Sequence, residues 1–262
     1  MGLDRNLAGN DGPHAQEQEA RMRSEIKGER ALVTGAGSGI GRTVSRKLAS
    51  LGCDVVLVGR TSSSLEGTKA LIDDDAVGSG EVRVCDLTRE DSISTLVREV
   101  RGEGGLDILV NNAGIMVNAP LEKTRTEDFD AILATNVRAP FLLMRETLPL
   151  LRESGAGEVV NVCSAVAYEG YPDQSAYTAS KHALLGLSRS FAREVFEDGV
   201  RVHVVAPGGV LTDMVATARP DLVGTPMIEP DDIADAIEYL LCHRTNAVCD
   251  EIRLHRSTKR PF

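Results

Sequence analysis

The sequence Thr34-Gly35-Ala36-Gly37-Ser38-Gly39-Ile40-Gly41 begins at the last residue of a mostly apolar stretch, residues 31–34, and precedes a segment with helical periodicity. A strand, a glycine-rich turn and a helix in this order are typical of a phosphate-binding turn, because unpaired N–H groups at a helix N-terminus favour an anion. Glycine has no Cβ, so it lets the backbone approach a phosphate closely. The spacing is GxxxGxG, not the common GxGxxG. It predicts a dinucleotide site that includes Gly35, Ser38, Gly39, Ile40 and Gly41.

Apolar runs alternate with amphipathic segments along nearly the whole chain, which predicts a parallel sheet covered by helices on both faces. We expect strands at residues 31–34, 55–58, 82–85, 108–111, 159–163, 202–205 and 251–254. We expect helices at residues 41–51, 64–73, 90–101, 126–148, 175–196 and 230–241. The prediction is therefore a single doubly wound α/β domain over residues 25–262. Residues 1–24 are polar and are expected to form a flexible tail, with Met22 as an alternative start.

Composition excludes several classes of function for this 262-residue chain. Its net charge of −10 disfavours binding to a phosphate backbone, and 3% aromatic residues leave few platforms for stacked bases, so we expect no nucleic-acid partner. No apolar run is long enough to span a membrane and the N-terminus lacks a signal pattern, which predicts a cytoplasmic protein without a membrane partner. The five cysteines lack CxxC spacing and are expected to be core residues, with no metal site.

The tip of the second predicted strand reads Val58-Gly59-Arg60-Thr61 and lies about 20 residues beyond the glycine turn. In doubly wound folds this tip faces the adenosine ribose, where a carboxylate binds the 2′-hydroxyl of NAD. Arg60 offers a guanidinium, which suits the 2′-phosphate of NADP. We therefore predict NADP(H) as the preferred cofactor and keep NAD(H) as the alternative, because Arg60 could also be an ordinary surface residue.

A second group of polar residues falls where a substrate would bind. Tyr177 and Lys181 are four residues apart in a predicted helix and share one of its faces. Ser164 directly follows a buried strand, at the sheet edge where ligands bind in this class of fold. Asn136 lies within a predicted helix, where asparagine is not favoured by propensity. A tyrosine–lysine pair at this spacing is common by chance, so the position of Ser164 carries much of the inference.

The order and spacing of these motifs resemble the single-domain short-chain dehydrogenases/reductases, which have a Rossmann fold. The resemblance spans residues 26–254 and rests on the following motifs: residues 34–41, Asp86-Leu87-Thr88, residues 111–114, Asn136, Ser164, Tyr177-Thr178-Ala179-Ser180-Lys181, Pro207-Gly208 and Thr212. It implies an oxidoreductase that interconverts a secondary alcohol and a ketone, or an aldehyde, with NADP(H). The alternative is a cofactor-sensing protein that binds NADP on the same fold without turnover.

The resemblance also implies a role for each matching residue. Tyr177 would be the general acid/base, Lys181 would bind the nicotinamide ribose and stabilise the phenolate, Ser164 would orient the substrate oxygen, and Asn136 would hold a proton-relay water. Asp86 and Leu87 would contact the adenine, and Thr212 the nicotinamide carboxamide. Further cofactor contacts are expected at Asn112, Ala113, Gly114, Pro207, Gly208 and Val210.

Two further expectations concern the substrate and the assembly. The expected substrate pocket is mostly apolar, which suggests an uncharged or partly apolar alcohol or ketone; its residues are Ile115, Met116, Val166, Tyr168, Tyr171, Leu211, Met214 and Val215. A homodimer or homotetramer is expected through the helices that contain Asn136 and Tyr177. The apolar residues that suggest it are Leu142, Leu143, Leu184, Leu185, Leu187 and Phe191. His203 replaces an asparagine that is frequent in the family and is expected to be structural.

Overall fold

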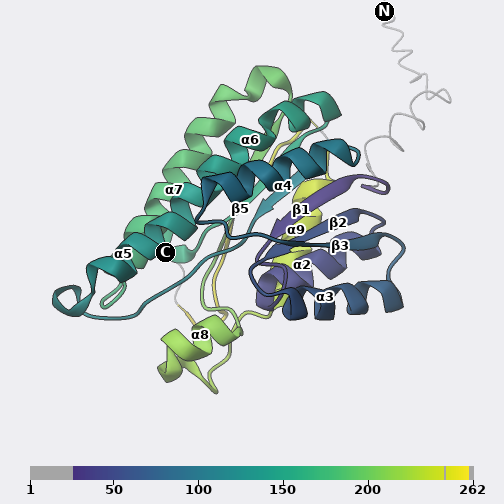
Figure 1. The fold of residues 1–262 in the computed structure, drawn as a ribbon. Coiled ribbons are helices and arrows are strands. Elements are labelled where there is room, and N and C mark those ends of the chain that lie inside the picture. Colours follow the sequence, from purple (N-terminus) through teal and green to yellow (C-terminus); the bar gives the residue numbers. More distant parts are fainter. Residues whose placement is uncertain (1–25, 245, 260–262) are drawn as a thin grey trace, which may run out of the picture.

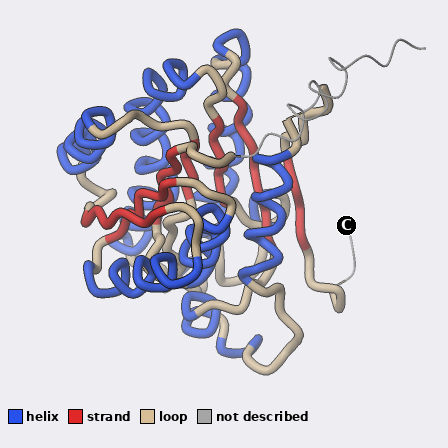
Figure 2. The backbone as a smooth tube through the Cα atoms, turned by 90° about the vertical axis from the view of Figure 1, so that its right-hand side faces the viewer, coloured by secondary structure: helices blue, strands red, loops and turns tan. Residues whose placement is uncertain are grey.

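Parallel strands form one sheet in the order β3-β2-β1-β4-β5-β6-β7 in the computed structural model, which describes residues 26–244 and 246–259 (Figures 1 and 2). The strands are β1 Arg30–Thr34, β2 Asp54–Gly59, β3 Ser79–Val84, β4 Ile108–Asn111, β5 Glu158–Val162, β6 Arg201–Pro207 and β7 Glu251–Leu254. The predicted doubly wound, seven-stranded parallel sheet is thereby confirmed. The strand order reverses between β1 and β4, and this is where such folds bind their ligands.

Helices cover both faces of the sheet (Figure 1). The helices α2 Gly39–Ser50, α3 Ser62–Asp75 and α9 Pro230–Cys242 pack on one face, and α4 Glu90–Gly102, α6 Ala139–Ser154 and α7 Ser175–Glu194 pack on the other. Successive side chains of β1 point to opposite faces. Ala31 and Val33 join the apolar core under α2, α3 and α9, whereas Leu32 joins the core under α4, α6 and α7.

The prediction of one continuous helix over residues 126–148 is wrong, because the helix is interrupted and ends later in the chain. The chain forms α5 Thr126–Leu133, a π-helical turn Ala134–Arg138, and then α6, which continues to Ser154. A π-helical turn inserts one extra residue into a helix and often marks a functional position. Asn136 lies in the middle of this turn, so the break concerns one of the predicted site residues.

Two other segments differ from the sequence prediction. The third strand begins at Ser79 and ends at Val84, whereas residues 82–85 were expected. All of its residues except Gly80 are half-buried or exposed because it is an edge strand, so it lacks the continuous apolar run that revealed the central strands. The loop after β6 contains a short helix, α8 Asp213–Ala218, that the apolar periodicity did not reveal. The predicted tail, residues 1–24, lies outside the described residues.

His203 takes part in a buried polar network at the amino-terminal half of the sheet. Its Nε2 lies 2.8 Å from Glu158 Oε2 and its Nδ1 lies 2.8 Å from the Cys249 carbonyl oxygen. Arg244 Nε lies 3.1 Å from Glu158 Oε1, and Arg244 also pairs with Glu29. His203 and Glu158 are both only 2% exposed. This network supports the expected structural role of His203.

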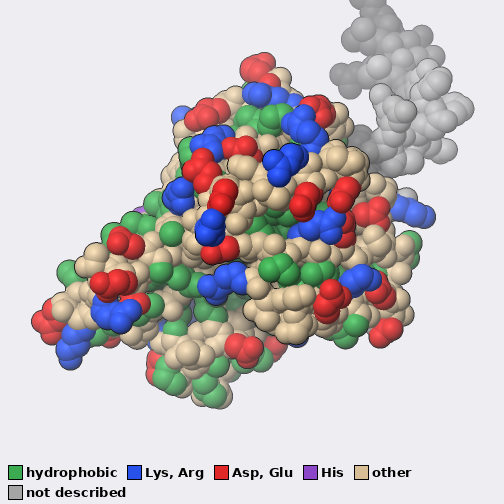
Figure 3. Space-filling model, in the orientation of Figure 1, with side chains coloured by type: hydrophobic (Ala, Val, Ile, Leu, Met, Phe, Trp, Pro, Cys, Tyr) green, Lys and Arg blue, Asp and Glu red, His purple; other side chains and the backbone are tan. Residues whose placement is uncertain are grey.

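The surface shown in Figure 3 carries acidic and basic side chains in alternation over α4 and α6. Glu90, for example, pairs with both Arg138 and Arg145, at 3.0 and 2.7 Å. Cys53, Cys85 and Cys163 are buried, while Cys242 and Cys249 are half-buried, and all five are free thiols. None of the helices among the described residues is long and apolar enough to cross a membrane.

Candidate active site

The glycine turn joins β1 to α2 in a conformation that its glycines make accessible. Gly35 and Gly39 have φ values of +68° and +48°, in the left-handed region that side chains with a Cβ rarely adopt. Ser38 is the N-cap of α2, so the free N–H groups at the start of this helix face the space above the sheet. The predicted turn, with its helix N-terminus, is therefore present.

The segment after β4 is held against this turn by Thr34. The Thr34 hydroxyl accepts hydrogen bonds from the backbone N–H groups of Asn112 and Ala113, both at 3.0 Å. In return, Asn112 Nδ2 donates to the Thr34 carbonyl at 2.8 Å. Thr34 is 1% exposed, so these bonds are shielded from water. They fix the spacing of the two loops at the point where the strand order reverses.

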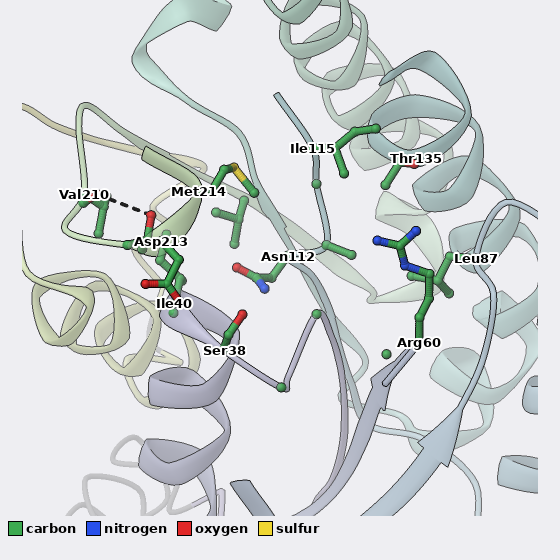
Figure 4. A pocket seen from close by; sticks show the side chains of 18 of the residues that line it. Ser38, Ile40, Arg60, Leu87, Asn112, Ile115, Thr135, Val210, Asp213 and Met214 are labelled. Carbon is green, nitrogen blue, oxygen red and sulfur yellow. Dashed lines mark hydrogen bonds between the residues drawn. The ribbon is translucent and has the colours of Figure 1, made fainter. Parts of the chain in front are cut away.

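A cavity lies at this edge of the sheet. Arg60 is on one side of it and Val210, Asp213 and Met214 are on the other, with Asn112 between them in the view of Figure 4. Asp86 accepts hydrogen bonds from the Thr88 hydroxyl and N–H, at 2.7 and 3.0 Å. These bonds hold the pKa of Asp86 below its usual value, and the nearby Arg60 acts in the same direction. Arg60 is exposed, and no carboxylate within hydrogen-bond distance of it is found in the described part of the chain.

This cavity has a volume of about 350 Å³ and is called the dinucleotide cavity below. All of the predicted cofactor residues except Gly41 line it. They are Gly35, Ser38, Gly39, Ile40, Arg60, Asp86, Leu87, Asn112, Ala113, Gly114, Tyr177, Lys181, Pro207, Gly208, Val210 and Thr212.

Gly41 does not line the dinucleotide cavity and has a packing role instead. A Cβ on this residue would lie 2.2 Å from the Gly35 carbonyl oxygen and 2.5 Å from Asn112 Nδ2. The third glycine therefore allows α2 to pack against the turn and the loop after β4. A direct contact between Gly41 and a cofactor stays a prediction.

Sequence reasoning missed several hydroxyl groups of the dinucleotide cavity. Thr61, Ser64, Thr88 and Thr135 all line it. The run Thr61-Ser62-Ser63-Ser64 directly after Arg60 indicates a phosphate site in the sequence, because hydroxyl groups and a guanidinium together favour a phosphate.

Tyr177, Lys181 and Ser164 come together at the carboxyl end of β5. Lys181 Nζ lies 5.8 Å from the centroid of the Tyr177 ring and donates to the Val162 carbonyl oxygen at 2.9 Å. Lys181 is 4% exposed, so its ammonium is held in place by the protein. Ser164 is also buried, and its hydroxyl oxygen accepts a weak hydrogen bond from the Val166 N–H at 3.4 Å.

Asn136 does not line the dinucleotide cavity, although it was predicted beside the other site residues. Its side chain is fully buried and bonds both backbone groups of Ile115: Nδ2 donates to the carbonyl and Oδ1 accepts from the N–H, each at 2.9 Å. Nδ2 also donates to the Ser180 hydroxyl at 3.1 Å. The amide thus links the loop after β4 to the helix that carries Tyr177 and Lys181.

A second, smaller cavity of about 210 Å³ adjoins the first, and Ser164 and Tyr177 line both. Met116, Val166, Tyr171, Met214 and Val215 line it as predicted, while Ile115 lines the dinucleotide cavity.

Two of the expected pocket residues line neither cavity. The Tyr168 hydroxyl donates to Glu251 at 2.6 Å, and the guanidinium of Arg253 covers its ring, so Tyr168 belongs to the β7 side of the sheet. Leu211 is 54% exposed. The second cavity is also lined by Arg219, Arg256 and Lys259, so the expectation of a mostly apolar, uncharged pocket is incomplete.

Comparison with known proteins assigns the chain to a family. Residues 29–223 match the short chain dehydrogenase family. The 3-oxoacyl-(acyl-carrier-protein) reductase of Rickettsia bellii is 35% identical over 233 residues, covering 86% of this chain and 93% of that protein. The D-beta-hydroxybutyrate dehydrogenase of Rhizobium meliloti is 35% identical over 211 residues, covering 79% of this chain and 81% of that protein.

A solved structure agrees with these relatives. A metagenomic short-chain oxidoreductase in complex with NADP has a TM-score of 0.78 and 35% identity, covering 90% of this chain and 100% of that one. The chain therefore belongs to the short-chain dehydrogenase family of oxidoreductases, as the sequence motifs predicted.

Proposed function

We propose that this protein is an NADP(H)-dependent oxidoreductase that interconverts a secondary alcohol and a ketone, with Tyr177 as the general acid/base. The observation that carries the proposal is that Tyr177 and Ser164 line both cavities. A substrate in the smaller cavity and a dinucleotide in the larger one would meet at these two hydroxyl groups. The names of both relatives refer to an oxo or a hydroxyl group, which supports this choice of reaction.

The dinucleotide cavity fits a nicotinamide dinucleotide in shape and chemistry. A Cβ on Gly114 would lie 3.3 Å from Asn136 Oδ1 and 3.7 Å from Lys181 Nζ, so glycine keeps this stretch of the cavity open. The glycine turn and the N-terminus of α2 would bind the pyrophosphate. Arg60, Thr61 and Ser64 would bind a 2′-phosphate, which favours NADP(H) over NAD(H).

The roles of the three polar side chains follow from the charge that develops on the substrate. When bound, the reduced nicotinamide supplies a hydride to the carbonyl carbon. The C=O π-electrons then move to oxygen, which takes the proton from the Tyr177 hydroxyl as the new O–H bond forms. The Ser164 hydroxyl donates a hydrogen bond to the same oxygen. Lys181, held by the Val162 carbonyl, stabilises the phenolate that Tyr177 becomes.

Asn136 has a positioning role in this proposal. Its contacts with Ile115 and Ser180 hold the loop after β4 and α7 at a fixed separation. This supports a structural contribution to the site, whereas the proton-relay water suggested by the family resemblance remains a prediction.

We also propose a homo-oligomer, on grounds that differ from the sequence argument. Leu142, Leu143, Leu184, Leu185 and Phe191 are buried within the single chain, so five of the six residues that suggested spare apolar surface belong to the core. A shallow apolar groove instead lies across α5, the π-helical turn, α6 and α7, where Phe141 is 45% exposed. This groove supports an interface between copies of the chain.

Turnover of a substrate distinguishes an enzyme from the alternative, a protein that binds NADP without catalysing a reaction. A panel of secondary alcohols and ketones is assayed by the change in NADPH absorbance, with NADH in parallel. We expect oxidation of NADPH with at least one ketone, at a higher kcat/KM than with NADH. NADPH binding by fluorescence titration, without turnover of any compound, would favour the binding protein.

A further inference from the structure

The smaller cavity has an apolar side, a reacting end and a basic end, and is called the basic cavity below. Ser164 and Tyr177 form the reacting end. Met116, Val166 and Leu222 are among the residues of its apolar side. Arg219, which follows α8, and Arg256 and Lys259, from the segment after β7, form the basic end.

The carboxylates near the basic end leave part of its positive charge unpaired. Arg219 uses Nε and Nη2 to bind Asp221, at 2.8 and 2.7 Å, which leaves Nη1 available. Lys259 pairs with Glu169 at 2.7 Å and donates to the Tyr171 hydroxyl. Asp173 also acts on Arg219 through its charge.

None of the described residues that line the basic cavity is an aspartate or a glutamate. The nearby carboxylates pair with Arg219 and Lys259 without lining the cavity themselves. The cavity wall therefore presents cations to a ligand.

Arg256 differs from the other two cations in its partners. Its Nη1 contacts the Thr225 hydroxyl at 3.3 Å and the Met227 sulfur at 4.0 Å, both neutral groups. In the described part of the chain no carboxylate lies within ion-pair distance of the Arg256 guanidinium, and Arg256 is half-buried. Asp221 acts on Arg256 through its charge without forming an ion pair with it. A partly desolvated guanidinium that is not bonded to an anion binds one favourably, because the cost of its burial has already been met by the fold.

We infer that the substrate carries a carboxylate, which Arg256 binds together with Arg219 and Lys259 while Tyr177 and Ser164 hold the reacting oxygen. The inference rests on the proposed function, since it needs the reaction to occur at Tyr177. A volume of about 210 Å³ is smaller than the roughly 300–1,000 Å³ of pockets for drug-sized ligands, which favours a short oxo acid or hydroxy acid over a steroid. This proposal differs from the sequence-based expectation of an uncharged or partly apolar alcohol or ketone.

The test compares acids with esters of the same carbon skeleton. Acetoacetate and levulinate, with their methyl esters, are assayed with NADPH at constant ionic strength. We expect a higher kcat/KM for each acid than for its ester. Arg256→Gln should lower the acid-to-ester ratio of kcat/KM about tenfold or more, as expected for loss of a charge-assisted hydrogen bond, and Arg256→Lys should restore part of it.

The matched control is Arg253→Gln, which removes the same charge three residues away. The Arg253 guanidinium lies 3.9 Å from the centroid of Tyr168, outside the basic cavity, so this variant should leave the acid-to-ester ratio unchanged. If wild type turns over acid and ester equally and Arg256→Gln does not change the ratio, the inference is wrong while the proposed function stands.

A binding measurement covers the case in which none of the four compounds turns over. Levulinate should raise the Tm of the NADP-loaded wild type more than its methyl ester does, and Arg256→Gln should abolish the difference. Equal shifts with acid and ester, or none with either, would overturn the inference. Failure of the proposed function is recognised separately, by a Tyr177→Phe variant that keeps wild-type turnover with any neutral ketone.

Discussion

The ammonium of Lys181 lies 5.8 Å from the centroid of the Tyr177 ring, one turn along α7, and is anchored to the Val162 carbonyl at 2.9 Å. This anchor connects a strand of the sheet to the helix that carries the proposed acid/base. The ammonium therefore keeps its place near the phenol without help from a ligand. The geometry that the proposed chemistry needs is therefore provided by the fold itself.

The first prediction concerns cofactor choice. Arg60→Ala should raise the KM for NADPH by about tenfold, because one charge-assisted bond to the 2′-phosphate is lost, and should leave the KM for NADH little changed. Arg98→Ala, which removes an exposed arginine from α4, is the control. Steady-state kinetics with both cofactors gives the answer, and equal KM values for NADPH in wild type and Arg60→Ala would remove Arg60 from the site.

The second prediction concerns the buried network of His203. His203→Ala should lower the free energy of unfolding by about 2 kcal/mol, because Glu158 Oε2 and the Cys249 carbonyl oxygen each lose the ring nitrogen that contacts them. NADPH binding should change little, since the network lies at the opposite end of the strands from the site. Urea denaturation measures the effect, with the exposed His182→Ala as control. A variant as stable as the control would refute the structural role.

The third prediction concerns stability in acid. Glu251 bonds Arg189 and Tyr168, and these contacts lower the pKa of its carboxyl. A group with a lowered pKa in the folded state stabilises the fold above its ordinary pKa, about 4.3, and loses that contribution as the pH falls through the folded value.

Glu251→Gln should therefore reduce Tm near neutral pH and flatten its decline below about pH 4. Thermal melts from acid to neutral pH measure both effects, and the exposed Glu122→Gln serves as the comparison. A Glu251→Gln curve parallel to the wild-type curve would contradict the assignment.

The fourth prediction concerns assembly. Phe141→Glu places a charge in the apolar groove on α6 and should shift the protein from oligomer to monomer, as seen by light scattering. Phe196→Glu alters an aromatic that is 73% exposed outside this groove and should leave the mass unchanged. A wild-type mass near 28.0 kDa at all concentrations would refute the oligomer itself.

Central strands and the glycine turn could be predicted because their signals are local. Ala31, Leu32 and Val33 of β1 are apolar and buried, and the turn after the strand needs glycine at positive φ. The edge strand β3 was misplaced because all of its residues except Gly80 are exposed or only half-buried. The π-helical turn at Asn136 could not be predicted, since it depends on contacts with Ile115 and Ser180 that lie far away in sequence.

The difference between local and long-range signals also explains which site residues were predicted and which were missed. Tyr177 and Lys181 were found because their spacing puts them on one helix face and because Ser164 follows a buried strand at the edge of the sheet where ligands bind. Arg256 follows β7 and Arg219 follows α8, so only the folded chain brings them to one cavity. Tyr168 follows Ser164 closely in sequence, yet its contact with Glu251 turns it away from the pocket.

Single-turnover reduction of a ketone by the NADPH-loaded enzyme tests the central claim most directly. Tyr177→Phe removes the proton donor while keeping the ring, so the rate should fall by about two to four orders of magnitude with NADPH affinity nearly unchanged. Tyr239→Phe, an exposed tyrosine of α9, should react at the wild-type rate. A Tyr177→Phe enzyme that transfers hydride as fast as wild type would contradict the account.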